Sequence, residues 1–210
     1  MTSKKSEIPQ NLLEALHHSE EETYLEYKGD VSWSNRKKKL EIVQTIFALA
    51  NERDGGIIVI GVKNDGERIG LSQENFSSYS HDYLHQYLTG KGNQPIKCKL
   101  EKFEYKEEKD TEDKRFVFIQ VAESKEFPVV YIAQTARIDQ NIDTHPNNIG
   151  LRKGALYIRN KQDVGSKEIE SAQEWEEVIE RTYRKYERET IRRYETLKGR
   201  DNPYDSELTI

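Results

Sequence analysis

Apolar residues recur at helical spacing in four parts of the chain, and each part predicts a helix. The first predicted helix spans residues 9–20, and the second runs from a cap at Ser34 or Asn35 to about residue 51. The third spans residues 72–88 and the fourth residues 167–198. The fourth is the longest, and its acidic residues gather in the first half and its basic residues in the second, as the helix dipole favours.

Shorter apolar runs between these helices predict strands. Residues 23–28 alternate, so that Glu26 and Lys28 share one face of a strand while Leu25 and Tyr27 share the other. Residues 57–60 are continuously apolar after two glycines, which indicates a strand covered on both faces. The turn Asn64-Asp65-Gly66 predicts that residues 67–71 return as a hairpin partner. Further strands are predicted at residues 96–105, 115–121, 128–133 and 155–159, and residues 134–150 read as a long irregular loop.

This order of elements predicts an α+β (mixed α/β) fold, a sandwich of a mixed sheet with helices that is followed by a long C-terminal helix. We expect one domain over residues 1–166, a helix over 167–198 that packs on the domain or on a partner, and a tail over 199–210. The alternative for the helix is direct contact with nucleic acid.

Composition narrows the class of protein. Apolar and charged residues each make up 34% of the chain, and 12 Tyr and 6 Phe indicate a partly aromatic core. A single cysteine excludes an internal disulfide framework. No apolar run has the length of a membrane span and the start is polar, so we expect a cytoplasmic protein with no membrane partner. The net charge of −5 excludes a uniformly basic nucleic-acid binder but allows a local basic surface.

Two groups of basic residues are candidates for contact with nucleic acid. Arg36, Lys37, Lys38 and Lys39 stand at a predicted helix N-terminus, where the dipole disfavours cations and an anionic partner would offset the cost. The second group surrounds the last predicted strand and consists of Arg152, Lys153, Arg159 and Lys161, with Tyr157 available for stacking. The alternative for both groups is a solvated run of charge.

Four segments occur in the order seen in one known family. They are Glu21-Glu22-Thr23-Tyr24-Leu25-Glu26-Tyr27-Lys28, then Ala48-Leu49-Ala50-Asn51 with Gly55-Gly56-Ile57-Ile58-Val59-Ile60-Gly61-Val62, then Asn64-Asp65-Gly66 with Ile69-Gly70, and Tyr157-Ile158-Arg159. Over roughly residues 11–172 the chain resembles the Schlafen AlbA-like domain family, also catalogued as DNA-binding or divergent ATPase-like domains. The chain has no Gly-x-x-x-x-Gly-Lys-Ser/Thr phosphate loop.

The resemblance implies a site. Glu21 and Glu26 match two acidic positions of the ribonuclease members, and Lys28 matches the basic residue that follows them. The third acidic position is Asn64 here, with Asp65 directly after it. The implied catalytic residues are Glu21, Glu26, Lys28 and Asp65, and the implied ligands of Mg²⁺ or Mn²⁺ are Glu21, Glu26, Asn64 and Asp65. An Asn ligand supplies no negative charge and would hold the metal more weakly. The alternative is a surface glutamate, or an ion pair of Glu26 with Lys28.

The function expected from the resemblance is nucleic-acid binding, directed at RNA, with divalent-metal-dependent endoribonuclease activity in bacterial defence. Whether the chain is an enzyme stays open, because a non-catalytic DNA- or RNA-binding adaptor and a protein-interaction module fit the sequence too. We expect a homodimer or a subunit of a larger complex. We also expect Glu26→Ala to abolish any cleavage and to leave the fold intact.

Overall fold

The computed structural model of the 210-residue chain describes residues 8–107, 111–125, 127–138, 149–162 and 164–198. The chain forms two compact units. One contains residues 1–124 and 129–169, and the other contains residues 125–128 and 170–210. Each unit is described by itself.

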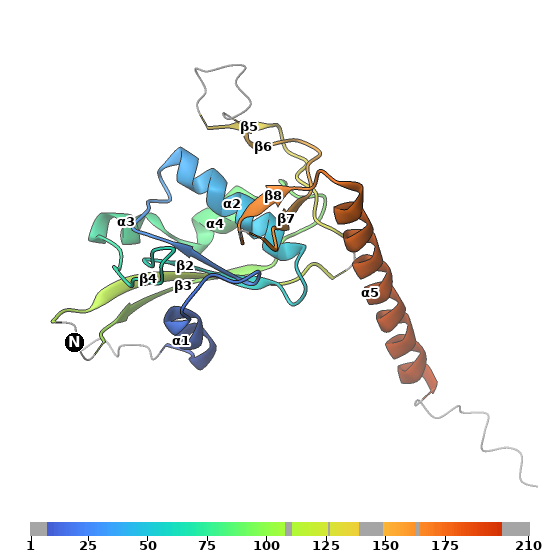
Figure 1. Cartoon of the computed structure of the whole chain (residues 1–210), viewed down its shortest axis with the longest axis horizontal. Coiled ribbons are helices and arrows are strands. Elements are labelled where there is room, and N and C mark those ends of the chain that lie inside the picture. The colour runs from blue at the N-terminus through green and yellow to red at the C-terminus, as the bar shows by residue number, and fades with distance from the viewer. Residues whose placement is uncertain (1–7, 108–110, 126, 139–148, 163, 199–210) are drawn as a thin grey trace, which may run out of the picture. The chain divides into compact units, whose positions relative to one another are not determined.

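A four-stranded mixed sheet forms the centre of the first unit (Figure 1). Its strands are, in spatial order, β1 (Leu25–Lys28), β2 (Gly56–Ile60), β4 (Lys114–Val121) and β3 (Cys98–Tyr105). β1 and β2 are parallel, whereas β2 with β4 and β4 with β3 are antiparallel. The α+β fold predicted from the sequence is confirmed.

Helices cover both faces of this sheet. α2 (Arg36–Ala50) and α4 (His81–Leu88) lie on one side and α1 (Gln10–His17) on the other, as Figure 1 shows. The sheet therefore separates two hydrophobic clusters. One contains Ile58, Ile60 and the buried apolar residues of α2, and the other contains Leu16, Tyr27 and Val59. The central strand β2 is buried on both faces, as its continuous apolar run predicted.

The close approach of β1 and α2 to the start of β2 explains one of the two glycines there. A Cβ on Gly56 would lie 2.4 Å from the Tyr24 carbonyl oxygen and 2.6 Å from a methyl carbon of Leu49. Only glycine fits without moving the backbone of β1.

The helix predicted over residues 72–88 is two helices, α3 (Gln73–Ser78) and α4. Between them Tyr79 is extended, with φ −88° and ψ 131°. Its side chain is 2% exposed, and its hydroxyl donates a hydrogen bond to the Val31 carbonyl oxygen at 2.9 Å. The helical spacing of apolar residues did not reveal this break, because the Tyr79 ring is buried by contacts with segments distant in the sequence, such as Val31.

Residues 67–71 return antiparallel after the turn, as predicted, but they form no strand and they pair with residues 61–63, beyond the end of β2. A bridge joins Val62 to Arg68, and beside it the Lys63 N–H donates to the Glu67 carbonyl oxygen at 2.9 Å and the Gly70 N–H to the Gly61 carbonyl oxygen at 2.8 Å. Both edges of β2 are already occupied, by β1 and β4, so no edge is left for a third partner.

The second half of the first unit also departs from the prediction. Residues 128–133 form single bridges, Val130 with Leu156 and Tyr131 with Gly92, and no strand. The predicted loop at 134–150 contains β5 (Ala136–Arg137) and the start of β6 (Ile149–Leu151), and residues 139–148 lie outside the described part. β7 (Tyr157–Arg159) is not the last strand, since it pairs with β8 (Ser166–Glu168). Because β8 occupies residues 166–168, the helix predicted from residue 167 begins instead at Ala172, as α5 (Ala172–Lys198) of the second unit.

Candidate functional site

A buried ion pair joins β1 to β7. Glu26 is 5% exposed, and one of its carboxylate oxygens accepts a hydrogen bond from Arg159 Nη1 at 2.6 Å. The other oxygen pairs with the Lys28 ammonium group. The predicted Glu26–Lys28 ion pair is therefore present, and Arg159 completes it from 133 residues further along the chain.

Arg159 uses its whole guanidinium group. Its Nε donates to the Thr23 carbonyl oxygen at 3.0 Å, Nη2 to the Glu22 carbonyl oxygen at 3.2 Å, and Nη1 also to Ser166 Oγ at 2.9 Å. Because Arg159 as a residue is only 3% exposed, these contacts are made away from bulk water. The predicted nucleic-acid contact by Arg159 would require this group to leave its partners.

Glu21 lies beside this pair and closes the free edge of β1. Its Oε1 accepts a hydrogen bond from the Tyr27 backbone N–H at 2.7 Å, a donor that β2 does not use. Burial raises the pKa of the Glu21 carboxyl group, and the neighbouring charge of Glu26 raises it further, whereas the hydrogen bond from Tyr27 and the charges of Lys28 and Arg159 act to lower it. Three of the four predicted catalytic residues, Glu21, Glu26 and Lys28, are thus within electrostatic reach of one another.

Asn64 and Asp65 lie in the exposed turn after β2. Asp65 Oδ1 accepts a hydrogen bond from the Glu67 N–H at 3.0 Å within this turn. The turn also approaches the chain just before Glu21, because a Cβ on Gly66 would be 2.9 Å from the Ser19 carbonyl oxygen. Within the described residues, no three His, Cys, Asp or Glu side chains are grouped so that they could hold a metal ion. Metal binding by Glu21, Glu26, Asn64 and Asp65 remains a prediction.

Basic and aromatic side chains converge at the start of α2. Arg36 Nε donates to the Arg137 carbonyl oxygen at 2.7 Å, which brings β5 beside this helix end. The Lys39 ammonium group lies 5.5 Å from the centre of the Trp33 ring and 5.4 Å from that of Tyr87. Lys91 also contacts the Tyr87 ring, at 4.6 Å. We call the set Arg36, Lys37, Lys39, Lys91 and Arg137 the basic surface.

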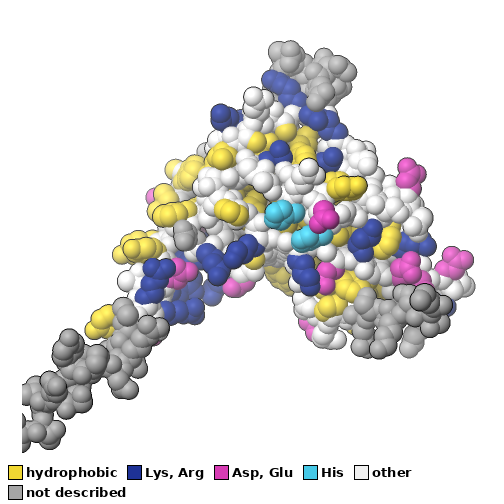
Figure 2. Space-filling view, turned by 180° about the vertical axis from the view of Figure 1, so that it is seen from behind, with side chains coloured by type: hydrophobic (Ala, Val, Ile, Leu, Met, Phe, Trp, Pro, Cys, Tyr) yellow, Lys and Arg dark blue, Asp and Glu magenta, His cyan; other side chains and the backbone are white. Residues whose placement is uncertain are grey.

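The neighbouring Lys38 is paired within the helix, since its ammonium group is 2.8 Å from Glu41 Oε2. Lys37 is exposed. On the face that Figure 2 shows, Lys and Arg side chains occur at the top of the view, the end where Figure 1 places β5 and β6, and also across its middle and lower left, with acidic side chains scattered among them. Trp33, Tyr87 and Lys91 were missed from the sequence because nothing local marks them as neighbours of Arg36.

The second predicted basic group, around β7, makes contacts within the domain at Arg152 and Tyr157. Arg152 forms an ion pair with Glu168 of β8, with Nε 3.0 Å from Oε2. Tyr157 is 2% exposed, its ring packs edge-on against Phe47, and its hydroxyl accepts the Arg152 backbone N–H at 2.7 Å. The stacking role predicted for Tyr157 is therefore wrong, because the ring belongs to the core. Lys153 and Lys161 are exposed.

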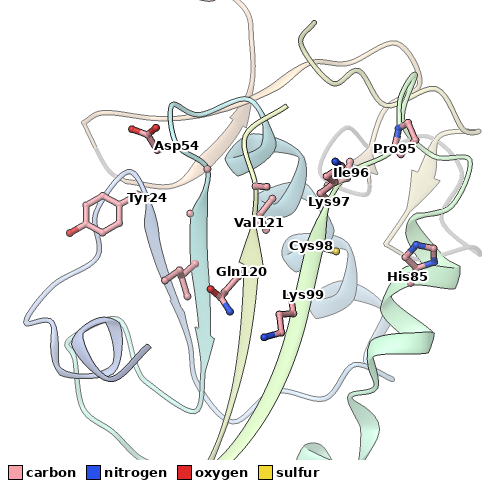
Figure 3. Close-up of a pocket in the computed structure, with 14 residues that line it drawn as sticks. Tyr24, Asp54, His85, Pro95, Ile96, Lys97, Cys98, Lys99, Gln120 and Val121 are labelled. Carbon is pink, nitrogen blue, oxygen red and sulfur yellow. The ribbon is translucent and has the colours of Figure 1, made fainter. Parts of the chain in front are cut away.

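A groove of about 780 Å³ lies at the end of the sheet where β2 and β3 begin and β4 ends. Figure 3 shows Lys99 and Gln120 adjacent on β3 and β4, with Tyr24 and Asp54 towards one side and His85 towards the other. Burial raises the pKa of the Cys98 thiol in this groove to about 11, so the thiol is neutral near pH 7.

Comparison with known families assigns the chain. A family model described as Schlafen, AlbA_2 matches residues 21–167, which contain the ion pair, the basic surface and the groove. The chain belongs to the Schlafen AlbA_2 family. Among solved structures, the crystal structure of the DIP2311 protein from Corynebacterium diphtheriae is similar at 14% identity, with a TM-score of 0.42. That match covers 73% of this chain and only 23% of the other, and no curated protein matches.

In this Schlafen AlbA_2 domain Asn51 joins two of the family segments. Its side-chain amide donates to the Val129 and Tyr157 carbonyl oxygens, at 2.9 and 3.0 Å, and its side-chain oxygen accepts the Val129 N–H at 2.6 Å. The family segments at 48–51 and 157–159 are therefore in direct contact. In the described part of the chain, no helix combines the length and the apolar character that a membrane span requires.

Proposed function

We propose that this Schlafen AlbA_2 domain binds nucleic acid through the basic surface at the start of α2. The observation that carries the proposal is that Lys39 lies over the Trp33 and Tyr87 rings and Lys91 over Tyr87, within electrostatic reach of Arg36, in a chain of net charge −5. Family membership supports the same function.

The physical basis is the attraction of a local cationic field for phosphates. Cations that contact phosphates release condensed counterions, and this release supplies most of the sequence-independent affinity. The ammonium groups of Lys39 and Lys91 lie over aromatic rings, and this contact holds their charges in place before a ligand arrives. The start of α2 adds the positive end of a helix dipole.

We further propose that RNA is preferred to DNA, a preference that follows from resemblance to ribonuclease members of the family. The test is fluorescence anisotropy with labelled tRNA and with a DNA duplex of similar length. We expect tighter binding of tRNA. Equal affinity for both would remove the RNA preference and leave nucleic-acid binding in place.

The basic surface is tested by Lys37→Ala/Lys91→Ala, which removes two charges and leaves Lys39 packed on its rings. We expect the affinity for tRNA to fall roughly tenfold or more, since two phosphate contacts are lost. The matched control is Arg53→Ala/Lys63→Ala, which removes two exposed charges after the far end of α2 and after β2. Equal losses in both variants would reject this surface as the binding site.

Metal-dependent RNA cleavage is a second candidate, which the proximity of Glu21, Glu26 and Lys28 favours. A bound Mg²⁺ or Mn²⁺ would polarise the phosphate. Both Glu26 oxygens are already bonded to cations, so Glu26 would have to change partners to ligate a metal.

The cleavage test is incubation of labelled tRNA with the protein and Mg²⁺ or Mn²⁺, with Glu21→Gln as the variant. Cleavage that Glu21→Gln abolishes would support the enzyme. Intact tRNA with either metal, together with measurable binding, would identify a non-catalytic adaptor. A lack of salt-dependent affinity for any nucleic acid would instead favour a protein-interaction module.

A further inference from the structure

Tyr83 is an exposed aromatic residue of α4 that lies next to the basic surface. The residue is 59% exposed. Tyr83 and Tyr87 are one helical turn apart in α4, so their side chains lie on the same side of the helix, with Cβ atoms about 5–6 Å apart. Tyr83 was not among the residues that the sequence predicted to contact nucleic acid.

Tyr87 is the ring beside which the cations of the basic surface gather. The ammonium groups of Lys39 and Lys91 lie 5.4 and 4.6 Å from its centre. Burial raises the pKa of the Tyr87 hydroxyl group and the charge of Arg36 acts to lower it, so Arg36 is within electrostatic reach of the same ring. Tyr83 therefore stands one helical turn from a concentration of positive charge.

The helix that carries Tyr83 is held in place by the core. Leu84 and Leu88 of α4 are buried in the larger hydrophobic cluster. Trp33, which is 5% exposed, packs edge-on against the Tyr87 ring, with 5.8 Å between the ring centres. Because its backbone is fixed in this way, Tyr83 needs to restrict only its own side chain when it binds a ligand.

A single exposed tyrosine is common on protein surfaces, and the neighbouring cations are what point to a ligand here. Proteins that bind single-stranded nucleic acid combine cations that contact the backbone with aromatic rings on which bases stack. A nucleotide whose base stacks on Tyr83 can direct its phosphate towards Lys39 and Lys91, about one helical turn away. Inside a duplex both faces of each base are covered by neighbouring bases, so a protein ring stacks readily only on an unpaired base.

We propose that Tyr83 stacks on an unpaired base of the nucleic acid whose phosphates bind to the basic surface. The substrate class is then RNA with unpaired bases, as in single strands and loops, and a continuous duplex lacks this contact. The inference rests on the proposed function, because it assigns a base to the phosphates that the basic surface holds.

The first test is fluorescence anisotropy with one labelled RNA strand, alone and paired along its full length with its complement. We expect Tyr83→Ala to weaken binding of the single strand about fivefold or more, since a base loses its stacking partner. Binding of the duplex should change by less than about twofold, because its contacts are with phosphates. Tyr83→Phe keeps the ring and should bind the single strand as the wild type does.

The matched control is His85→Ala, which removes another exposed ring from α4. His85 is two residues from Tyr83, which corresponds to about 200° around the helix axis. Its side chain lines the groove at the end of the sheet (Figure 3). We expect this variant to bind both RNA forms as the wild type does. Circular dichroism checks that the three variants keep their helix content.

Several outcomes would overturn the inference and leave binding at the basic surface in place. They are an unchanged affinity of Tyr83→Ala for the single strand, an equal loss for single strand and duplex, and an equal loss in His85→Ala. A loss in Tyr83→Phe as large as in Tyr83→Ala would also overturn it, because the contact would then depend on the hydroxyl group. A wild-type protein that binds neither RNA form would remove the proposed function and, with it, this inference.

The second test locates the stacked base directly. The single strand is prepared with 5-iodouridine in place of uridine, which on irradiation forms a covalent bond with an aromatic side chain that contacts the base. We expect mass spectrometry of the crosslinked wild-type protein to identify the peptide that contains Tyr83, and we expect this product to be lost in Tyr83→Ala. A crosslink only at other aromatic residues, or no crosslink to a strand that binds, would overturn the assignment.

Discussion

At the scale of single residues, the buried Glu26–Arg159 ion pair determines how much a substitution of Glu26 destabilises the domain. The side chains of Glu26 and Arg159 are 6% and 0% exposed. Glu26→Ala would leave a guanidinium group buried without its carboxylate, so we expect a loss of about 3–5 kcal/mol in the free energy of unfolding, measured in urea. We therefore expect Glu26→Ala to weaken the fold as well as any cleavage.

The control for that measurement is Glu67→Ala, which removes a carboxylate from the exposed pair with Lys63. We expect a change of about 0.5 kcal/mol or less, since solvent already screens that pair. A similar, small effect of Glu26→Ala would mean that the buried pair does not stabilise the domain.

Glu21 predicts a dependence of stability on pH. Its raised pKa means that the folded chain binds this proton more tightly than the unfolded chain, whose value is near 4.5. The stabilising effect of the proton is therefore fully present below about pH 4.5 and is lost as the pH rises through the folded pKa. Glu21→Gln keeps an acceptor for the Tyr27 N–H and carries no charge.

We accordingly expect Glu21→Gln to raise the melting temperature near about pH 7, and the difference from wild type to shrink as the pH falls towards about 4.5. Differential scanning calorimetry at several pH values measures this. Glu22→Gln, which alters the exposed neighbour, should change nothing. A Glu21→Gln protein that is less stable than wild type near neutral pH would show that the ionised form is the favoured one.

Residue-level prediction from the sequence succeeded where partners are close in the chain. The alternation in residues 23–28 placed Glu26 and Lys28 on one face, and the structure pairs them. Arg159 was assigned to nucleic acid, because no local pattern reveals that its partner lies in β1. The stacking role predicted for Tyr157 was wrong for the same reason, since the burial of its ring depends on packing against Phe47, which is distant in the sequence.

At the scale of elements, local signals located most helices and strands. Asn35 caps α2 by accepting the Lys38 N–H at 3.0 Å, as predicted, and β3 and β4 lie within about two residues of the predicted strands 96–105 and 115–121. The errors arise where distant segments compete. Residues 67–71 pair only with residues 61–63, because β1 and β4 occupy both edges of β2, and the chain at Tyr79 is extended to bury one ring.

Asn51 is the side chain by which α2 holds the segment before β7. Three backbone groups, of Val129 and Tyr157, use this one amide, which is 9% exposed. We expect Asn51→Ala to cost about 3 kcal/mol or more, because each buried group left unpaired costs about 1–3 kcal/mol. Hydrogen exchange should show a loss of protection at the Val129 N–H.

The matched control is Asn64→Ala, in the exposed turn after β2. We expect it to leave protection at Val129 unchanged. An Asn51→Ala protein with full protection at Val129 would show that the segment at 129 is held by its other contacts.

At the scale of the whole molecule, net charge and local charge act in opposite directions. A chain of net charge −5 repels a polyanion at long range, whereas the basic surface attracts phosphates once they are within a few ångströms. Salt screens the long-range repulsion and also weakens the contacts. The sign of the salt dependence therefore reports which of the two effects dominates binding.

We expect the contacts to dominate, so that the logarithm of the tRNA association constant falls linearly with the logarithm of the salt concentration. Lys37→Ala/Lys91→Ala should reduce the steepness of that line by about 1.4 to 1.8, because each lost phosphate contact removes about 0.7–0.9. Arg53→Ala/Lys63→Ala should leave the slope unchanged, although it alters the net charge by the same amount. Anisotropy titrations at four or five salt concentrations measure all three lines. If both double variants changed the slope equally, the affinity would follow total charge, and the arrangement of Lys39 and Lys91 over two aromatic rings would have no part in it.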